Sequence, residues 1–423
     1  MAVTASGSVI GCGQNDEGQV RPDLPTEELL LRPSLVEPVL SHRVIQVSCG
    51  LYHTACVTAA GVAITWGGNE AGQLGHSADV TRRARPMAVQ VAGAGQAWSS
   101  SRRAVRVSCG DLFTLILTSR AEVLSCGVGE CVGGDGTDRK QAALVQSLVG
   151  FPTVWMACGN SHSVVIGSGG EAVAFGLNTH GQLGIGSMVE GDGPAVLLPR
   201  PVIGTSSQPT TSLPDDGNTS TPRLPSAGGA KGASVVDRDA GGVVVAVGDG
   251  RVGKTSSNGG GFIPPLFLAS RATCGQSHTV LVSKHGEAWV CGRNRSGQLG
   301  LDPASTTSTS VPVHFGGSYT RAQGDESNVV VVEAAAGRAH TLLLLNDGRV
   351  LGFGSDEFGA VTGSPAARRS DSAGGGGGGE EEAATAAPHE MRWQPREIEA
   401  WPGQLVVSVS AGGEQSFALA LEP

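Results

Sequence analysis

The residues whose spacing most resembles a chemical signature are Gly248, Gly253, Lys254 and Thr255, in the stretch "GDGRVGKT". They match G-x-x-x-x-G-K-[ST], a loop whose backbone N–H groups hold nucleotide phosphates. Such a loop must lead into a helix, whose first N–H groups complete the site. Here "SSNGGGFIPP" follows, and its Gly and Pro residues oppose a helix. We therefore interpret the match as a chance resemblance, with direct nucleotide hydrolysis as a third hypothesis.

The cysteines fall mainly on two repeated positions. One set directly precedes a glycine and a second set shares another place in the repeat: Cys49, Cys109, Cys158 and Cys274, then Cys12, Cys126 and Cys291. The sequence has no C-x-x-C pair, which a structural zinc site would favour. We therefore expect small buried strand residues and no metal site.

Four histidines also share one position, three residues after a repeated glycine: His53, His162, His278 and His340. One imidazole at a fixed place in several units indicates a structural contact with a neighbouring strand or turn. Asn15, Asn69, Asn178 and Asn294 likewise share a place where asparagine suits a turn. We expect no catalytic residue and no cofactor, so the protein is not expected to be an enzyme.

A repeat accounts for these coincidences. A short aliphatic run ends at each of Gly50, Gly110, Gly159, Gly275, Gly337 and Gly412. A second glycine follows the first five after 17 residues, at Gly67, Gly127, Gly176, Gly292 and Gly354. A third follows after five more, at Gly72, Gly181, Gly297 and Gly359, whereas Val132 interrupts the second unit.

Each unit reads as short β-branched strands separated by glycine turns. A fourth, proline-containing strand such as "RPMAVQV" suits an outer edge. Repeated four-stranded units predict an all-β fold, a β-propeller of four-stranded antiparallel blades. We expect one domain over residues 1–423.

The two ends of the chain each supply half a unit. "SGSVIGCGQNDEGQV" matches the back half and "LVVSVSAGGEQSFALALEP" the front half, so their pairing would close the ring. Aligning Gly248 with Gly292 places Ser234 opposite His278 and Gly242 opposite Gly286. This degenerate unit brings the predicted total to seven blades.

Two insertions interrupt the repeat, at 204–232 and 364–392, and their composition predicts disorder. We expect partner specificity in the irregular segments 76–104, 186–232, 301–328 and 364–395.

Composition limits the partners. The formal net charge is −9, which disfavours direct nucleic-acid binding, and no apolar run is long enough for a membrane span. The first residues do not resemble a signal peptide, and nine cysteines without one indicate reduced thiols in the cytoplasm or nucleus.

The Cys-Gly-x-x-His-Thr and aromatic-Gly-x-Asn-x-x-Gly-Gln-Leu-Gly stretches resemble the regulator-of-chromosome-condensation repeat family. The second pattern is complete at Trp66–Gly75 and Phe175–Gly184, and has Cys for the aromatic at Cys291–Gly300. The Trp-Asp propellers are less similar because their signatures are absent. The resemblance implies a protein-interaction scaffold, or alternatively a guanine-nucleotide exchange factor for a Ran-like small GTPase.

Overall fold

The protein is described here from a computed structural model. It describes residues 1–24, 29–76, 82–91, 98, 101–187, 195–205, 244–247, 251–254, 267–315, 329–356, 360–361, 391–398 and 405–421. These residues form strands and three short 3-10 turns: η1 (Glu37–Val39), η2 (Gly129–Cys131) and η3 (Gln146–Leu148). The predicted all-β class is confirmed. No helix in this part of the chain is long and apolar enough to cross a membrane.

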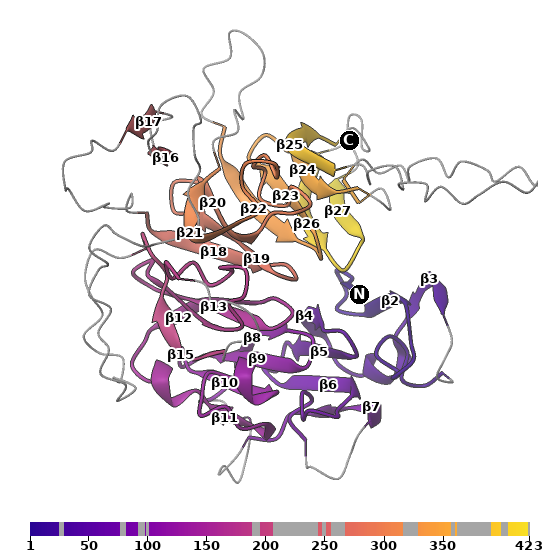
Figure 1. The fold of residues 1–423 in the computed structure, drawn as a ribbon. Coiled ribbons are helices and arrows are strands. Elements are labelled where there is room, and N and C mark those ends of the chain that lie inside the picture. The colour runs from indigo at the N-terminus through magenta and orange to yellow at the C-terminus, as the bar shows by residue number, and fades with distance from the viewer. Residues whose placement is uncertain are drawn as a thin grey trace, which may run out of the picture.

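Five four-stranded antiparallel sheets follow one another along the chain and around the ring (Figure 1). The first blade contains β4 (Val44–Cys49), β5 (His53–Thr58), β6 (Ala63–Gly68) and β7 (Arg82–Ala88). The second contains β8 (Ala104–Cys109), β9 (Phe113–Thr118), β10 (Val123–Gly127) and β11 (Arg139–Leu144). The third contains β12 (Thr153–Cys158), β13 (His162–Gly167), β14 (Ala172–Gly176) and β15 (Val196–Pro201). The fourth contains β18 (Ala269–Cys274), β19 (His278–Ser283), β20 (Ala288–Arg293) and β21 (Ser308–His314). The fifth contains β22 (Val331–Ala336), β23 (His340–Leu345), β24 (Val350–Ser355) and β25 (Met391–Glu397).

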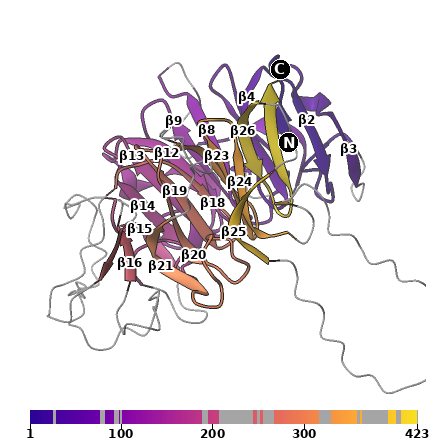
Figure 2. The same cartoon turned by 90° about the horizontal axis from the view of Figure 1, so that it is seen from above.

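The chain termini form two partial sheets. The N-terminal sheet contains β1 (Ala2–Val3), β2 (Val9–Gly13) and β3 (Leu30–Leu35), and the C-terminal hairpin contains β26 (Leu405–Ala411) and β27 (Ser416–Leu421). They are drawn next to each other in the ring (Figures 1 and 2). The described sheets thus make six blades, with the sixth split between the termini.

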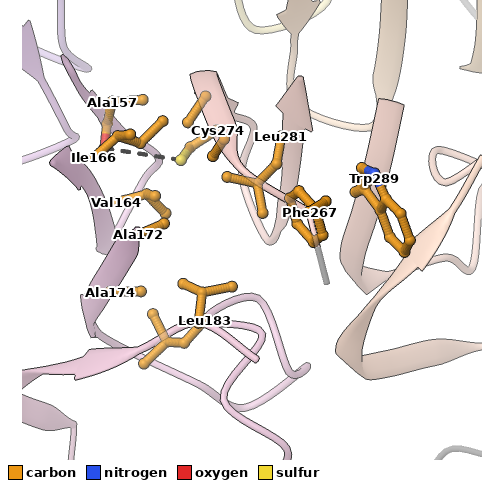
Figure 3. Packing of buried hydrophobic residues seen from close by; sticks show 13 residues of the cluster. Ala157, Val164, Ile166, Ala172, Ala174, Leu183, Phe267, Cys274, Leu281 and Trp289 are labelled. Carbon is orange, nitrogen blue, oxygen red and sulfur yellow. Dashed lines mark hydrogen bonds between the residues drawn. The ribbon is translucent and has the colours of Figure 1, made fainter. Parts of the chain in front are cut away.

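The prediction of seven blades is therefore wrong for the described residues. The third and fourth blades pack directly on each other, with Leu183 and Cys274 in one buried cluster (Figure 3). The sulfur of Cys274 lies 3.8 Å from the carbonyl oxygen of Ala157 across this junction. No blade stands between them, because their inner strands β12 and β18 are in contact.

The degenerate unit forms a two-stranded sheet instead. Strand β16 (Val244–Val247) pairs with β17 (Arg251–Lys254), with Val247 opposite Arg251. Ser234 and Gly242 lie outside the described residues.

The predicted irregular segments 76–104, 186–232, 301–328 and 364–395 contain the outer strands β7, β15, β21 and all but the last residues of β25. Strand β25 begins at Met391, within the expected insertion 364–392. Thr205, within the expected insertion 204–232, is buried and its Oγ1 accepts a hydrogen bond from the backbone of Ala172 at 3.0 Å. Residues 206–232 and 364–390 lie outside the described part.

Two glycine positions explain the regular turns. Gly67 and its equivalents end the third strand with φ between +104° and +115°, a region that side chains with a Cβ rarely adopt. Gly50 ends the first strand, where a Cβ would meet the carbonyl oxygen of Gly110 in the next blade. Gly159, Gly275 and Gly337 meet the following blade in the same way. These glycines let neighbouring blades approach closely around the central axis.

Candidate functional site

The four repeated histidines join each blade to the next. Nε2 of His53 lies 2.8 Å from Oγ1 of Thr114 in the second blade. The same contact joins His162 to Thr279, His278 to Thr341 and His340 to Ser416, each at 3.0 Å. All four imidazoles are buried. The structure therefore brings these residues into four separate junctions and not into one site.

The direction of each hydrogen bond follows from a second contact. Oγ1 of Thr114 donates its proton to the carbonyl oxygen of Gln73 at 2.8 Å, so it can only accept from the histidine. Thr279 and Thr341 donate in the same way to Gln182 and Gln298, at 2.7 and 2.8 Å. His53, His162 and His278 must then carry their protons on Nε2. We call this arrangement, with histidine and glutamine of one blade holding a hydroxyl of the next, the hydroxyl clamp.

Burial keeps these histidines neutral. Desolvation lowers the pKa of His53, His162 and His340 to about 4 and that of His278 to about 3. Nδ1 of His53, His162 and His278 meets no hydrogen-bond partner within the described part of the chain. These imidazoles therefore have neither the exposure nor the pKa of a general acid or base at neutral pH.

The second blade replaces the clamp with apolar packing. Phe113 stands at the histidine position. It packs in one cluster with Cys131 and Val132 of its own blade and with Met156 of β12, the inner strand of the third blade. Val132 does not occupy the place of Gly72, as the spacing predicted. Its carbonyl oxygen accepts a bond from Ser125, as that of Leu74 does from Thr65, so Val132 is equivalent to Leu74. The loop is shorter here, which simple counting along the sequence could not detect.

The third repeated glycines lie in the loop after the third strand. The side-chain oxygen of Asn69 accepts the backbone N–H of Leu74 at 2.9 Å and closes this loop. Asn15, Asn178 and Asn294 make the same contact. Gly72, Gly181 and Gly297 have φ of +85°, +78° and +76° within it, and Gly359 lies outside the described residues. The asparagines therefore act as structural turn residues.

The cysteines are free thiols with structural contacts. Sγ of Cys109 donates to the carbonyl oxygen of Ser48 in the preceding blade at 3.5 Å, and Cys126 donates to Gln73 at 3.4 Å. Burial raises the pKa of Cys56, Cys126, Cys131, Cys158 and Cys291 to about 12, and raises it further for Cys109 and Cys274. Such thiols are poor nucleophiles. Among the described residues no three His, Cys, Asp or Glu side chains converge as a metal site.

The phosphate-loop match is only partly within the described chain. Gly253 and Lys254 lie in β17, an extended strand, whereas Gly248 and Thr255 lie outside the described residues. A phosphate loop needs its lysine between a turn and a helix, which a strand does not provide.

The loops between the first and second strands of the blades begin with a glycine and then differ in residue type. They lie at 50–52, 110–112, 159–161, 275–277, 337–339 and 412–414, just before the repeated histidine position. We call them the channel-mouth loops, because the first strands of neighbouring blades contact each other at the centre of the ring. Leu51, Tyr52, Arg338 and Glu414 are exposed in them.

A polar cavity of about 280 Å³ opens between three of these loops. Gln276 and Ser277 come from the fourth blade, Arg338 from the fifth, and Glu414 from the C-terminal hairpin. Arg293, at the end of β20, completes its charged lining. Nη1 of Arg338 lies 3.0 Å from a carboxylate oxygen of Glu414. The sequence repeat gives no signal for this site, because Arg293, Arg338 and Glu414 belong to the variable part of each unit.

Comparison with family models gives two matches, both described as "Regulator of chromosome condensation (RCC1) repeat". One matches residues 6–57, 60–117 and 285–344, and the other residues 44–73, 156–182 and 331–360. Together they cover about half of the chain.

Two curated relatives show the extent of the similarity. The chain is 25% identical to the serine/threonine-protein kinase Nek8 of Danio rerio over 335 residues, 76% of this chain and 38% of that protein. It is 31% identical to the E3 ubiquitin-protein ligase HERC2 of Homo sapiens over 192 residues, 44% of this chain and 4% of the ligase. The chain thus spans well under half the length of these relatives.

Two solved structures share the fold. Human WBSCR16 has a TM-score of 0.67 at 19% identity, covering 100% of this chain and 84% of that one. Yeast RCC1 (Prp20), solved with Kap60 bound to it, has a TM-score of 0.66 at 19% identity, covering 99% and 78%. A separate structure of Prp20p from Saccharomyces cerevisiae, with a TM-score of 0.50, was described with its binding properties to Gsp1p and histones.

Proposed function

The chain belongs to the regulator of chromosome condensation (RCC1) repeat family, and from this premise we propose that it is a protein-binding platform without chemistry of its own. The proposal rests on a difference between two sets of residues within each unit. Residues that recur from blade to blade, such as His278 and Gln298, point into the junctions. Residues that differ between blades, such as Tyr52 and Arg338, are exposed at the channel mouth.

Proteins are the partners that suit this surface. The channel-mouth loops present apolar Leu51, aromatic Tyr52 and charged Arg338 within one rim, and mixed surfaces of this kind are typical of protein interfaces. We propose that the irregular segments named above add specificity. The free thiols support a reducing compartment, the cytoplasm or the nucleus.

We further propose that the C-terminal hairpin pairs with the N-terminal sheet and closes the ring. Three junctions between inner strands support this closure. In each, a side-chain hydroxyl accepts a hydrogen bond from a backbone N–H of the next blade. The pairs are Ser48 with Cys109, Ser108 with Cys158 and Thr273 with Ala336, at 3.0–3.3 Å. We call the boundary between the C-terminal hairpin and the first blade the seam. Ser410 of the hairpin stands at the position of the accepting hydroxyl, and Cys49 of the first blade stands at the position of the donating backbone N–H. The seam therefore carries both halves of a junction.

The hydroxyl clamp predicts a second seam contact. Oγ1 of Thr54 donates to the carbonyl oxygen of Gln19 at 2.6 Å, as Thr114 does to Gln73. At the histidine position of the C-terminal hairpin stands Gln415, whose amide N–H could donate to Thr54. Strand β1 must leave for this closure, because Val3 pairs with Val9, where the register of the other blades would place Leu419.

The alternative function is nucleotide exchange on a Ran-like GTPase. An inserted hairpin would be needed to open the partner's phosphate site, and β16–β17 is an inserted hairpin in this chain. Its described strands carry Arg251 and Lys254, and Asp249, the one acidic residue between Val244 and Lys254, lies outside the described residues, so this hairpin does not decide between the two functions. The platform is the function better supported.

Two measurements separate these functions. Affinity capture with the full chain should recover partner proteins that are lost with Leu51→Ala combined with Tyr52→Ala if the channel mouth binds them. A 206–230 deletion should retain binding at the channel mouth but change the relative recovery of these proteins. The second measurement follows release of labelled GDP from purified Ran-, Rab- and Rho-type GTPases. Acceleration of release by the purified chain would contradict the platform proposal.

A further inference from the structure

We propose that the cavity between the channel-mouth loops binds a carboxylate from an aspartate or glutamate of the partner protein. This inference rests on the proposed platform function and names the chemistry that the platform recognises. Its elements are Arg293, Arg338 and Glu414, which the sequence repeat does not explain.

Positive charge gathers at this cavity although the whole chain carries a formal charge of −9. Arg293 lines it and is half-buried, and no carboxylate pairs with this guanidinium in the described part of the chain. A half-buried guanidinium without an anion favours a ligand that supplies one.

Arg338 is held in place before any ligand binds. Its backbone N–H donates to the carbonyl oxygen of Gly413 at 2.7 Å. Its Nε donates to Oε1 of Gln276 at 3.4 Å, and its Nη1 reaches Glu414 at 3.0 Å. The backbone contact anchors the residue, and the two side-chain contacts orient the guanidinium at the mouth, which lowers the entropy cost of binding a second carboxylate.

Glu414 indicates what Arg338 accepts. It is a carboxylate from a neighbouring loop, and its own side chain and that of Arg338 are 43% and 57% exposed. Ion pairs this exposed contribute little free energy, so a partner's carboxylate can displace Glu414. Arg293 and Arg338 would then face the incoming carboxylate, while Glu414 acts as an internal competitor.

The test uses a fluorescent peptide with consecutive glutamates, a matched peptide with glutamines, and a matched peptide with phosphoserines, titrated against the full chain by anisotropy. The glutamate peptide should bind and the glutamine peptide should not. Arg293→Gln and Arg338→Gln should each weaken binding about tenfold. Glu414→Gln should strengthen it about threefold, because the competing carboxylate is gone.

Two matched variants control for bulk charge. Arg396→Gln removes an exposed cation from the outer strand β25, and Glu37→Gln an exposed anion from η1. Both should leave the affinity unchanged. Equal losses with Arg396→Gln and Arg338→Gln, binding of the glutamine peptide, or binding of the phosphoserine peptide alone would overturn the inference. Weaker binding by Glu414→Gln would also overturn it.

The outcomes separate this inference from the platform proposal. If no glutamate peptide binds but a protein still cross-links at the channel mouth, only the carboxylate assignment is lost. If the peptide binds as expected but no protein partner binds at the channel mouth, the assignment of the cavity as a carboxylate site is kept and the platform proposal fails.

Discussion

Nε2 of His278 lies 3.0 Å from Oγ1 of Thr341 in the next blade, and this hydroxyl gives its own proton to the carbonyl oxygen of Gln298. Three residues from two blades thus satisfy one another inside a junction. The arrangement explains why a histidine can recur through the chain without serving catalysis.

Replacing the hydroxyl tests the clamp. Thr341→Val keeps the shape of the side chain but leaves Nε2–H of His278 and the Gln298 carbonyl without their partner. We expect the free energy of unfolding to fall by about 2–4 kcal/mol, the cost of two unsatisfied buried polar groups. Urea unfolding followed by tryptophan fluorescence measures it. Thr307→Val, at an exposed threonine, is the matched control and should change little.

The buried histidines make stability depend on pH. Their pKa of about 3 to 4 in the folded state lies below the ordinary 6.5, so the unfolded chain binds more protons between those values. Stability should be intact above pH 6.5 and fall as the pH decreases toward 4. Each of the four histidines should contribute up to one proton taken up on unfolding.

A single substitution identifies the source of this dependence. His162→Phe, which copies the Phe113 of the second blade, should remove one proton from the uptake measured by urea unfolding at several pH values. His42→Phe, at an exposed histidine, should leave the uptake as in the natural chain. An unchanged slope in His162→Phe would show that this histidine does not carry the effect.

Thiol reactivity tests the closure of the ring. Cys49 is exposed and Cys12 half-buried, whereas Cys109 and Cys126, their equivalents in the second blade, are buried. If the hairpin closes the seam, brief maleimide labelling of the full chain should modify none of the nine thiols. A chain lacking residues 405–423 should then label at Cys12 and Cys49 alone, and protection of the other seven shows that it remains folded. Rapid labelling of both thiols in the full chain would contradict closure.

Nucleotide affinity tests the phosphate-loop match. Because Lys254 lies in a strand, we expect no measurable binding of ATP or GTP by calorimetry, and no difference between the natural chain and Lys254→Ala. An affinity that disappears in Lys254→Ala would show that the match is functional.

The sequence was sufficient for the fold class and for the regular junctions, because glycine spacing and strand alternation follow directly from backbone geometry. It failed where a local substitution is compensated in space. Phe113 and Cys131 together replace the hydroxyl clamp. The shorter loop before Val132 shifts the alignment of this blade with the others, and no residue type in the sequence signals that shift. The blade count failed because a glycine-rich stretch imitates a turn whether or not a blade surrounds it.

The candidate site was harder to predict for a related reason. Arg293, Arg338 and Glu414 come from three different units and have no counterparts in the others. Their proximity depends on how the ring brings the loops together, which a repeat alignment does not reveal.

The most direct test of the account places a photo-cross-linking phenylalanine derivative at Tyr52, an exposed aromatic residue of the channel mouth, and separately at Gln394 on the exposed outer strand β25. The account predicts that Tyr52 cross-links to a defined partner protein and that Gln394 does not. Cross-linking confined to Gln394 would contradict the claim that this protein binds its partner through the channel mouth.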